Sequence, residues 1–163
     1  MRRLVLIALG AVACGDPTAP GGVGRVRIAL VGTRDTIRFE VPVTATRCAG
    51  GTGLLVHGER RGQGVLLWLR GDRMENGTVP LLTRGDTVAT RGAMASVRFM
   101  TADLAHGLTL DDGAVTVTRA TPPLELSVRG RGVETTLGLQ RSAEVSLERV
   151  TLASDSTSCR VQP

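Results

Sequence analysis

Few residues in this sequence have side chains that commonly perform chemistry, and those few lie far apart. The chain has two histidines, His57 and His106, each followed by a glycine. A zinc site needs three or four ligands of defined geometry, and an activated nucleophile needs a base that a third group orients. No G-x-S-x-G or H-E-x-x-H sequence supplies such a set. A serine, a histidine and an aspartate from distant segments could still meet in the fold, but we predict no catalytic residue, no metal ligand and no cofactor.

The start of the chain has the order of residues found in a bacterial export signal. Met1–Arg3 is positively charged, Leu4–Val12 is apolar, and the small residues Ala11–Ala13 directly precede Cys14. A helix of nine residues rises about 13 to 14 Å, whereas a membrane-spanning helix must cross about 30 Å of hydrocarbon. The segment therefore targets the chain and does not anchor it.

The residues around Cys14 resemble the lipobox of bacterial lipoproteins, although Ala11 stands where that motif usually has leucine. The resemblance implies that Cys14 becomes the first mature residue and carries a lipid through its sulfur. The alternative is an ordinary A-x-A cleavage site, but a signal of thirteen residues is shorter than the usual 15 to 30. An unlipidated Cys14 would also leave an exported protein with an unpaired thiol. We predict a signal peptide over residues 1–13, secretion by the general route, and a lipid anchor in a membrane of the bacterial cell envelope, with the protein facing the periplasm or the exterior.

The other two cysteines, Cys48 and Cys159, are predicted to form a disulfide, because an exported protein folds in an oxidising compartment. The bridge would close a loop of about 110 residues, which corresponds to somewhat over 4 kcal/mol in the chain-entropy model. Two buried free thiols or a redox pair are the alternatives, but the sequence has no C-x-x-C motif.

The basic residues are all arginines, and they are dispersed along the chain. The formal charge is +5, and without Arg2 and Arg3 it falls to +3. Arginines occur singly or in pairs beside apolar or acidic residues, and no continuous basic block is present. Two phenylalanines and one tryptophan are too few for a platform on which bases stack. We therefore predict no nucleic-acid partner.

The mature chain divides into a tether, residues 14–24, and one domain, residues 25–163. Gly15–Gly24 is rich in proline and glycine and has no apolar periodicity, which is typical of a linker. In Thr36–Ala45 apolar and polar residues alternate, and Pro42 on the polar set predicts an edge strand or a bulge. Leu124–Val128 alternates in the same way, and the pattern appears again in Val133, Thr135, Leu137 and Leu139. Gly64–Leu69 is apolar on both faces, which predicts a central strand covered on both sides.

Turn-forming residues separate these runs, among them Asp111–Gly113 and Gly130–Gly132. The apolar phase changes between Ala143–Leu147 and Val150–Leu152, which predicts a β-bulge or bend near Glu148–Val150, or else two separate strands. No window of twelve residues has a convincing helical period. These patterns predict an all-β fold: a single antiparallel β-sandwich or barrel of about 8–10 short strands.

Two classes of function fit this sequence, and neither is catalytic. The first is a cell-envelope lipoprotein whose β-domain binds another envelope protein or has a structural role. The second is a small barrel that carries an apolar ligand in its interior. An enzyme would instead require His57 or His106 to lie in a cleft beside acids or hydroxyls. Polar segments between the strands, Gly71–Val79 and Glu59–Gly64, are the predicted partner-facing surface.

Overall fold

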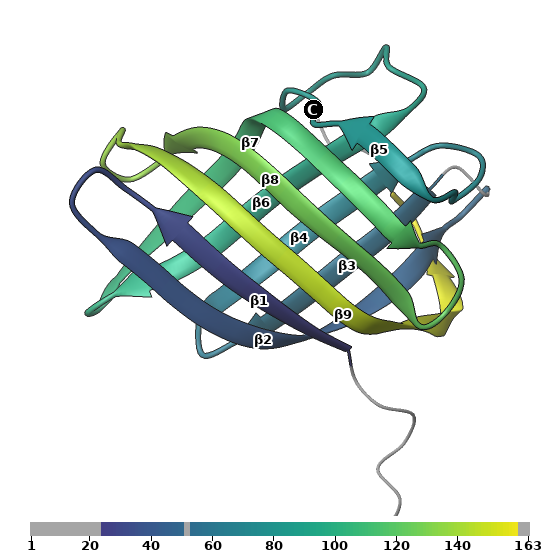
Figure 1. Ribbon diagram of the computed structural model, residues 1–163, viewed down its shortest axis with the longest axis horizontal. Helices are drawn as coiled ribbons and strands as arrows, with labels where there is room; N and C mark the ends of the chain where they lie inside the picture. Colours follow the sequence, from purple (N-terminus) through teal and green to yellow (C-terminus); the bar gives the residue numbers. More distant parts are fainter. Residues whose placement is uncertain (1–23, 51–52, 160–163) are drawn as a thin grey trace, which may run out of the picture.

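The computed structural model describes residues 24–50 and 53–159, which form nine β-strands (Figure 1). The strands are β1 (Gly24–Val31), β2 (Thr36–Cys48), β3 (Gly53–Arg60), β4 (Gln63–Arg70), β5 (Gly77–Pro80), β6 (Gly92–Thr101), β7 (Leu104–Arg119), β8 (Leu124–Glu134) and β9 (Gln140–Thr157). Eight of them close into a barrel in the order β1-β2-β3-β4-β6-β7-β8-β9, and β5 pairs with β7 beside it. The all-β prediction is confirmed, and of its two forms the barrel is correct. Within the described residues there is no helix of the length and apolarity that a membrane crossing requires.

The antiparallel order gives the barrel two different ends. The hairpin end carries the four short connections at residues 32–35, 61–62, 102–103 and 135–139. The terminal end carries the remaining connections, together with the start of β1 at Gly24 and the finish of β9. Beyond the start of β1, β9 pairs in parallel with β2, for example Thr44 with Thr151, and this pairing completes the closure.

Inward side chains of all eight barrel strands pack into one hydrophobic cluster. Most are leucine, valine or alanine, and the largest is Phe99, which is fully buried. An eight-stranded barrel is just wide enough for such side chains to fill. The inward residues of the eight strands belong to one cluster of buried side chains, which is the arrangement expected of a filled barrel.

The predicted bulge in the last strand is confirmed. β9 continues through Glu148–Val150, but its register with β8 shifts there: Leu126 pairs with Leu147, and Leu124 pairs with Val150. Arg149 has a φ of 54°. This one residue in the left-handed region inverts the inward phase, so that both Leu147 and Val150 are buried.

Pro42 lies at an outward position of β2, on the edge of the strand that faces β3, where β2 is locally unpaired. This agrees with the predicted edge position. The ladder between β2 and β3 runs only from Thr44 to Arg47, so the stretch around Pro42 is paired with β1 alone. The missing amide donor of the proline consequently interrupts no ladder on the β3 side.

Two of the segments predicted as turns, Asp111–Gly113 and Gly130–Gly132, lie inside strands instead. Asp112 and Gly113 sit at a register shift in the middle of β7, and Gly113 has a φ of 130°. The bend there lets the first half of β7 pair with β6 and the second half with β5. Gly130 and Gly132 lie within β8, and a Cβ on Gly132 would approach the carbonyl oxygen of Thr109 to 1.8 Å. Glycine serves close backbone approach in this part of the sheet, which its sequence signature does not distinguish from a turn.

Candidate functional site

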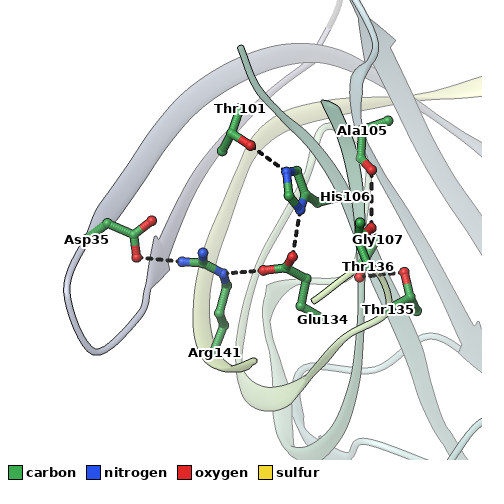
Figure 2. Close-up of polar contacts among 9 residues, drawn as sticks. All are labelled: Asp35, Thr101, Ala105, His106, Gly107, Glu134, Thr135, Thr136 and Arg141. Atoms are coloured by element: carbon green, nitrogen blue, oxygen red, sulfur yellow. Dashed lines mark hydrogen bonds and ion pairs between the residues drawn. The ribbon is translucent and has the colours of Figure 1, made fainter. Parts of the chain in front are cut away.

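A chain of polar side chains, three of them buried, lies at the hairpin end of the barrel (Figure 2). His106 Nδ1 lies 2.6 Å from Glu134 Oε1, and the other ring nitrogen is hydrogen-bonded with the hydroxyl of Thr101. Arg141 Nε donates to Glu134 Oε2 over 2.8 Å, and its Nη1 donates to Asp35 over 2.7 Å. Five residues from three separate segments of the sequence thus form one continuous hydrogen-bonded chain.

The aromatic part of this chain is built into the core. The His106 ring stacks on Phe99 with centroids 4.9 Å apart, and the guanidinium of Arg141 lies 5.3 Å from the Phe99 centroid. The relative exposure is 3% for His106, 0% for Glu134 and 6% for Arg141. Groups buried to this degree need charged or hydrogen-bonding partners, and here each has them.

Neighbouring charges keep the acids of the chain ionised. Burial raises the pKa of Glu134, but the hydrogen bonds from Arg141 and His106 oppose it, and the pKa lies below its ordinary value. A hydrogen bond from Arg141 likewise lowers the pKa of Asp35. Bonding to the same two carboxylates raises the pKa of Arg141. The result is a compact alternation of positive and negative groups.

Thr101, His106 and Glu134 have the order of a hydroxyl, a base and an orienting carboxylate, which is the order found in activated nucleophiles. However, the carboxylate of Glu134 also binds Arg141, and the side chain of His106 is only 2% exposed. The same contacts join three of the four connections at the hairpin end (Figure 2). Asp35 belongs to the connection between β1 and β2, Thr101 and His106 flank the one between β6 and β7, and Glu134 and Arg141 flank the one between β8 and β9. We interpret the chain as a cross-link of the hairpins.

Sequence reasoning missed Glu134 and Arg141. The predicted strand phase placed Val133 inward, but Val133 is 42% exposed and Glu134 is buried. The inward phase of Leu124 and Val128 in fact continues through the glycines of β8 to Glu134. Reading Gly130–Gly132 as a turn broke that phase, and an uninterrupted period of two would have revealed the buried acid.

The outer surface of the barrel has two unlike sides. The charged wall, on β1, β2, β8 and β9, consists of paired outward side chains: Arg25, Arg27, Glu40, Arg129, Glu144 and Glu148. Its shortest ion pair joins Arg27 to Glu148 over 2.7 Å. Solvated pairs of this kind are common on exposed sheet faces and contribute little to stability.

The opposite side, on β3, β4 and β6, is the apolar wall, made of outward Leu55, Leu66, Trp68 and Met94. Leu55, Trp68 and Met94 are direct neighbours across the three strands, and Leu66 is 47% exposed. The prediction that Gly64–Leu69 is covered on both sides is therefore wrong for the described residues. Val65 and Leu67 face the core. On the outer face Leu66 is exposed, whereas Trp68 is half-buried and has the guanidinium of Arg70 4.8 Å from its ring centroid.

An open groove of about 700 Å³ lies over the apolar wall. Leu82 borders it near the terminal end, and Thr135 and Thr136 border it near the hairpin end. A contiguous exposed apolar surface on a small domain is a frequent sign of a binding site. The groove is consequently the best candidate site for interaction on this protein.

The two polar segments predicted to form the partner surface lie at opposite ends of the barrel. Glu59–Gly64 is the β3–β4 hairpin at the hairpin end, whereas the Gly71–Val79 segment lies at the terminal end, where Met74 packs against the core. They cannot form a single surface. His57 is exposed on β3, and the predicted lipidation site at Cys14 lies outside the described residues.

Cys48 and Cys159 are joined by a disulfide with Cα atoms 5.3 Å apart, as predicted. The bridge ties the end of β9 to the end of β2, next to their parallel pairing, and Cys159 borders the groove.

Comparisons of the chain with protein-family models, with curated proteins and with solved structures find no match.

Proposed function

We propose that this protein is a noncatalytic cell-envelope lipoprotein, held to a membrane through Cys14, whose barrel binds another envelope component by its apolar wall. The observation that carries the proposal is the contrast between the two sides of the barrel. Acids neutralise the arginines of the charged wall, whereas exposed Leu66 and half-buried Trp68 and Met94 form an apolar surface beneath an open groove. Leaving such side chains exposed is unfavourable unless a partner covers them.

The proposed anchor would join the barrel at its terminal end. β1 begins at Gly24 on the terminal end, so a tether over residues 14–23 would join the barrel there. The disulfide at the same end fits an oxidising compartment outside the cytoplasm. A tether of about ten residues reaches at most about 33 to 36 Å, which keeps the barrel near the membrane.

Cys14→Ser tests the anchor. In cells fed a clickable fatty acid, the wild type should be labelled and recovered with membranes, whereas Cys14→Ser should be unlabelled and released as soluble protein. Equal labelling of the two proteins would refute lipid attachment at Cys14.

A photo-cross-linking amino acid at Leu66 tests the apolar wall, with the same group at Ser146 as the matched control. Both positions are exposed on outward faces of central strands, Leu66 on the apolar wall and Ser146 among the charged residues of β9. Irradiation of cells should yield a cross-linked envelope component at Leu66 and none at Ser146. Identical products at both positions, or none at Leu66, would exclude the wall as the binding surface.

A further inference from the structure

We propose that the groove on the apolar wall binds an anionic single-chain amphiphile, with the anionic head at Arg98 and the alkyl chain over Trp68 and Met94. This inference rests on the proposed use of the wall for binding and assigns the chemical class of its ligand. Arg98 lies on β6, four residues after Met94, and four residues of a strand span about 13 Å.

The groove has a polar end and an apolar end. Toward the hairpin end it is bordered by Arg98 and by the side chains of Ser96, Thr109 and Thr135. Toward the terminal end its floor is instead apolar, formed by Leu55, Trp68 and Met94, and Leu82 and Arg84 border it there. A ligand that matches both ends needs a polar head and an apolar tail.

The charge of the groove selects the sign of the head. Its charged lining residues are Arg84 and Arg98, and no aspartate or glutamate lines it. Neither arginine forms an ion pair with another described residue, in contrast to the arginines of the charged wall. An anionic group is therefore favoured electrostatically over a neutral or cationic one.

The floor of the groove favours an alkyl chain over an extended peptide. A peptide that adds to a sheet binds through the unpaired backbone of an edge strand. β4 is hydrogen-bonded along its length to β3 and β6, so its outer face offers side chains and no free edge. A second copy of the barrel would bring Arg84 and Arg98 to both sides of a symmetric interface, with no acid from this surface to neutralise them.

Trp68 is the single tryptophan of the chain and lies on the floor of the groove, so its fluorescence reports occupancy directly. The experiment titrates the full-length chain carrying Cys14→Ser, which removes competition from an attached lipid, with 11-bromoundecanoate below its micellar concentration. Bromine on the bound chain should quench Trp68 in a saturable way, and dodecanoate should reverse the quenching. The matched probe with a trimethylammonium head should bind several-fold more weakly.

Three variants locate the ligand. Arg98→Gln should weaken binding by up to about fivefold, which is the range of one exposed ion pair. Arg38→Gln removes an exposed arginine from β2 on the other side of the barrel and should leave binding unchanged. Leu66→Glu places a negative charge beside Trp68 and should weaken binding at least tenfold, with thermal unfolding measured to confirm that the barrel is intact.

The absence of saturable quenching in the parent chain would overturn the inference, as would equal binding of the cationic probe or equal effects of Arg98→Gln and Arg38→Gln. A dimer that Leu66→Glu dissociates, without quenching by the fatty acid, would overturn it in favour of self-association. If quenching fails while a partner is still cross-linked at Leu66, the ligand class is wrong and the binding role of the wall survives. If quenching succeeds and no partner is cross-linked, the amphiphile itself is the component bound.

Discussion

The buried residues Glu134 and Arg141 show how a charged chain can be accommodated in an aliphatic barrel. Removing a carboxylate from water is costly, and mutual attraction repays that cost only when the remaining hydrogen bonds are satisfied. Both carboxylate oxygens of Glu134 are hydrogen-bonded: Oε1 with His106 Nδ1, and Oε2 with Arg141 Nε. Gly32 leaves room for the ion pair between Asp35 and Arg141, because a Cβ at this position would lie 2.4 Å from Asp35 Oδ1 and 2.7 Å from Arg141 Nη1. These residues specify how the hairpins meet.

Glu134→Gln should destabilise the barrel by roughly 3 to 5 kcal/mol at pH 7, because it leaves the buried charge of Arg141 only partly compensated. Urea unfolding followed by circular dichroism measures this loss. The control is Glu125→Gln, which breaks an exposed pair with Arg119 at 3.2 Å and should cost at most about 1 kcal/mol. Equal losses in the two variants would contradict the role assigned to the buried chain.

Acid should remove the advantage of the wild type over Glu134→Gln. The pKa of Glu134 is lower in the folded protein than in the unfolded chain, so its ionised form stabilises the fold. That contribution is complete above the unfolded pKa of about 4.3 and disappears as the pH falls through the lower folded value. Unfolding free energies of the two proteins should therefore converge as the pH falls below the unfolded pKa, and a gap that is as large in acid as at pH 7 would disprove the coupling.

At the level of elements, glycines and one arginine set the bends that let long strands serve two neighbours. Gly113 bends β7 between its pairing with β6 and its pairing with β5. Arg149 performs the corresponding task in β9, where the chain passes from β1 toward the parallel ladder with β2. An arginine in this left-handed conformation carries strain of about 1 to 2 kcal/mol that glycine would not.

Arg149→Gly should consequently leave the unfolding free energy unchanged or raise it by up to about 1 kcal/mol, because the relief of strain offsets the extra freedom of glycine in the unfolded chain. Arg129→Gly, at an exposed and extended position of β8, should lower stability by about 1 kcal/mol. Thermal and urea unfolding of both variants provide the comparison. A loss at Arg149 as large as that at Arg129 would show that the bulge stores no strain.

At the level of the whole molecule, closure depends on the ends of β2 and β9 staying together. Their parallel ladder is short and irregular, with a register shift between Ala45 and Arg47. The Cys48–Cys159 disulfide lies immediately beyond this ladder and links positions 111 residues apart. The disulfide therefore restrains the ends of β2 and β9, where the backbone ladder between the two strands is short.

Cys159→Ser should lower the unfolding free energy by roughly 2 to 4 kcal/mol, since the unfolded chain regains the freedom that the long loop removes. Cys48→Ser should have the same effect, and the double variant should be no worse than either single one. Cys14→Ser is the matched control and should leave stability unaltered. Intact wild-type protein that reacts with a thiol reagent at both positions would contradict the bridge.

The sequence by itself determined the properties that depend on neighbouring residues. Alternation in Thr36–Ala45 and the phase change at Glu148–Val150 predicted strands and a bulge correctly, because one buried face imposes a period of two on the chain. The pairing of Cys48 with Cys159 followed from cysteine counting.

Only the tertiary structure decided which apolar faces are buried and which polar residues meet. The sequence could not show that Leu66 on the outer face of Gly64–Leu69 lies exposed, since an apolar run looks the same whether one or two layers cover it. Glu134, Arg141 and Asp35 meet across hairpins far apart in the chain, and closure of the sheet brings them together. The groove likewise arises from residues on four neighbouring strands, β3, β4, β6 and β7, and such a surface exists only once these strands have paired.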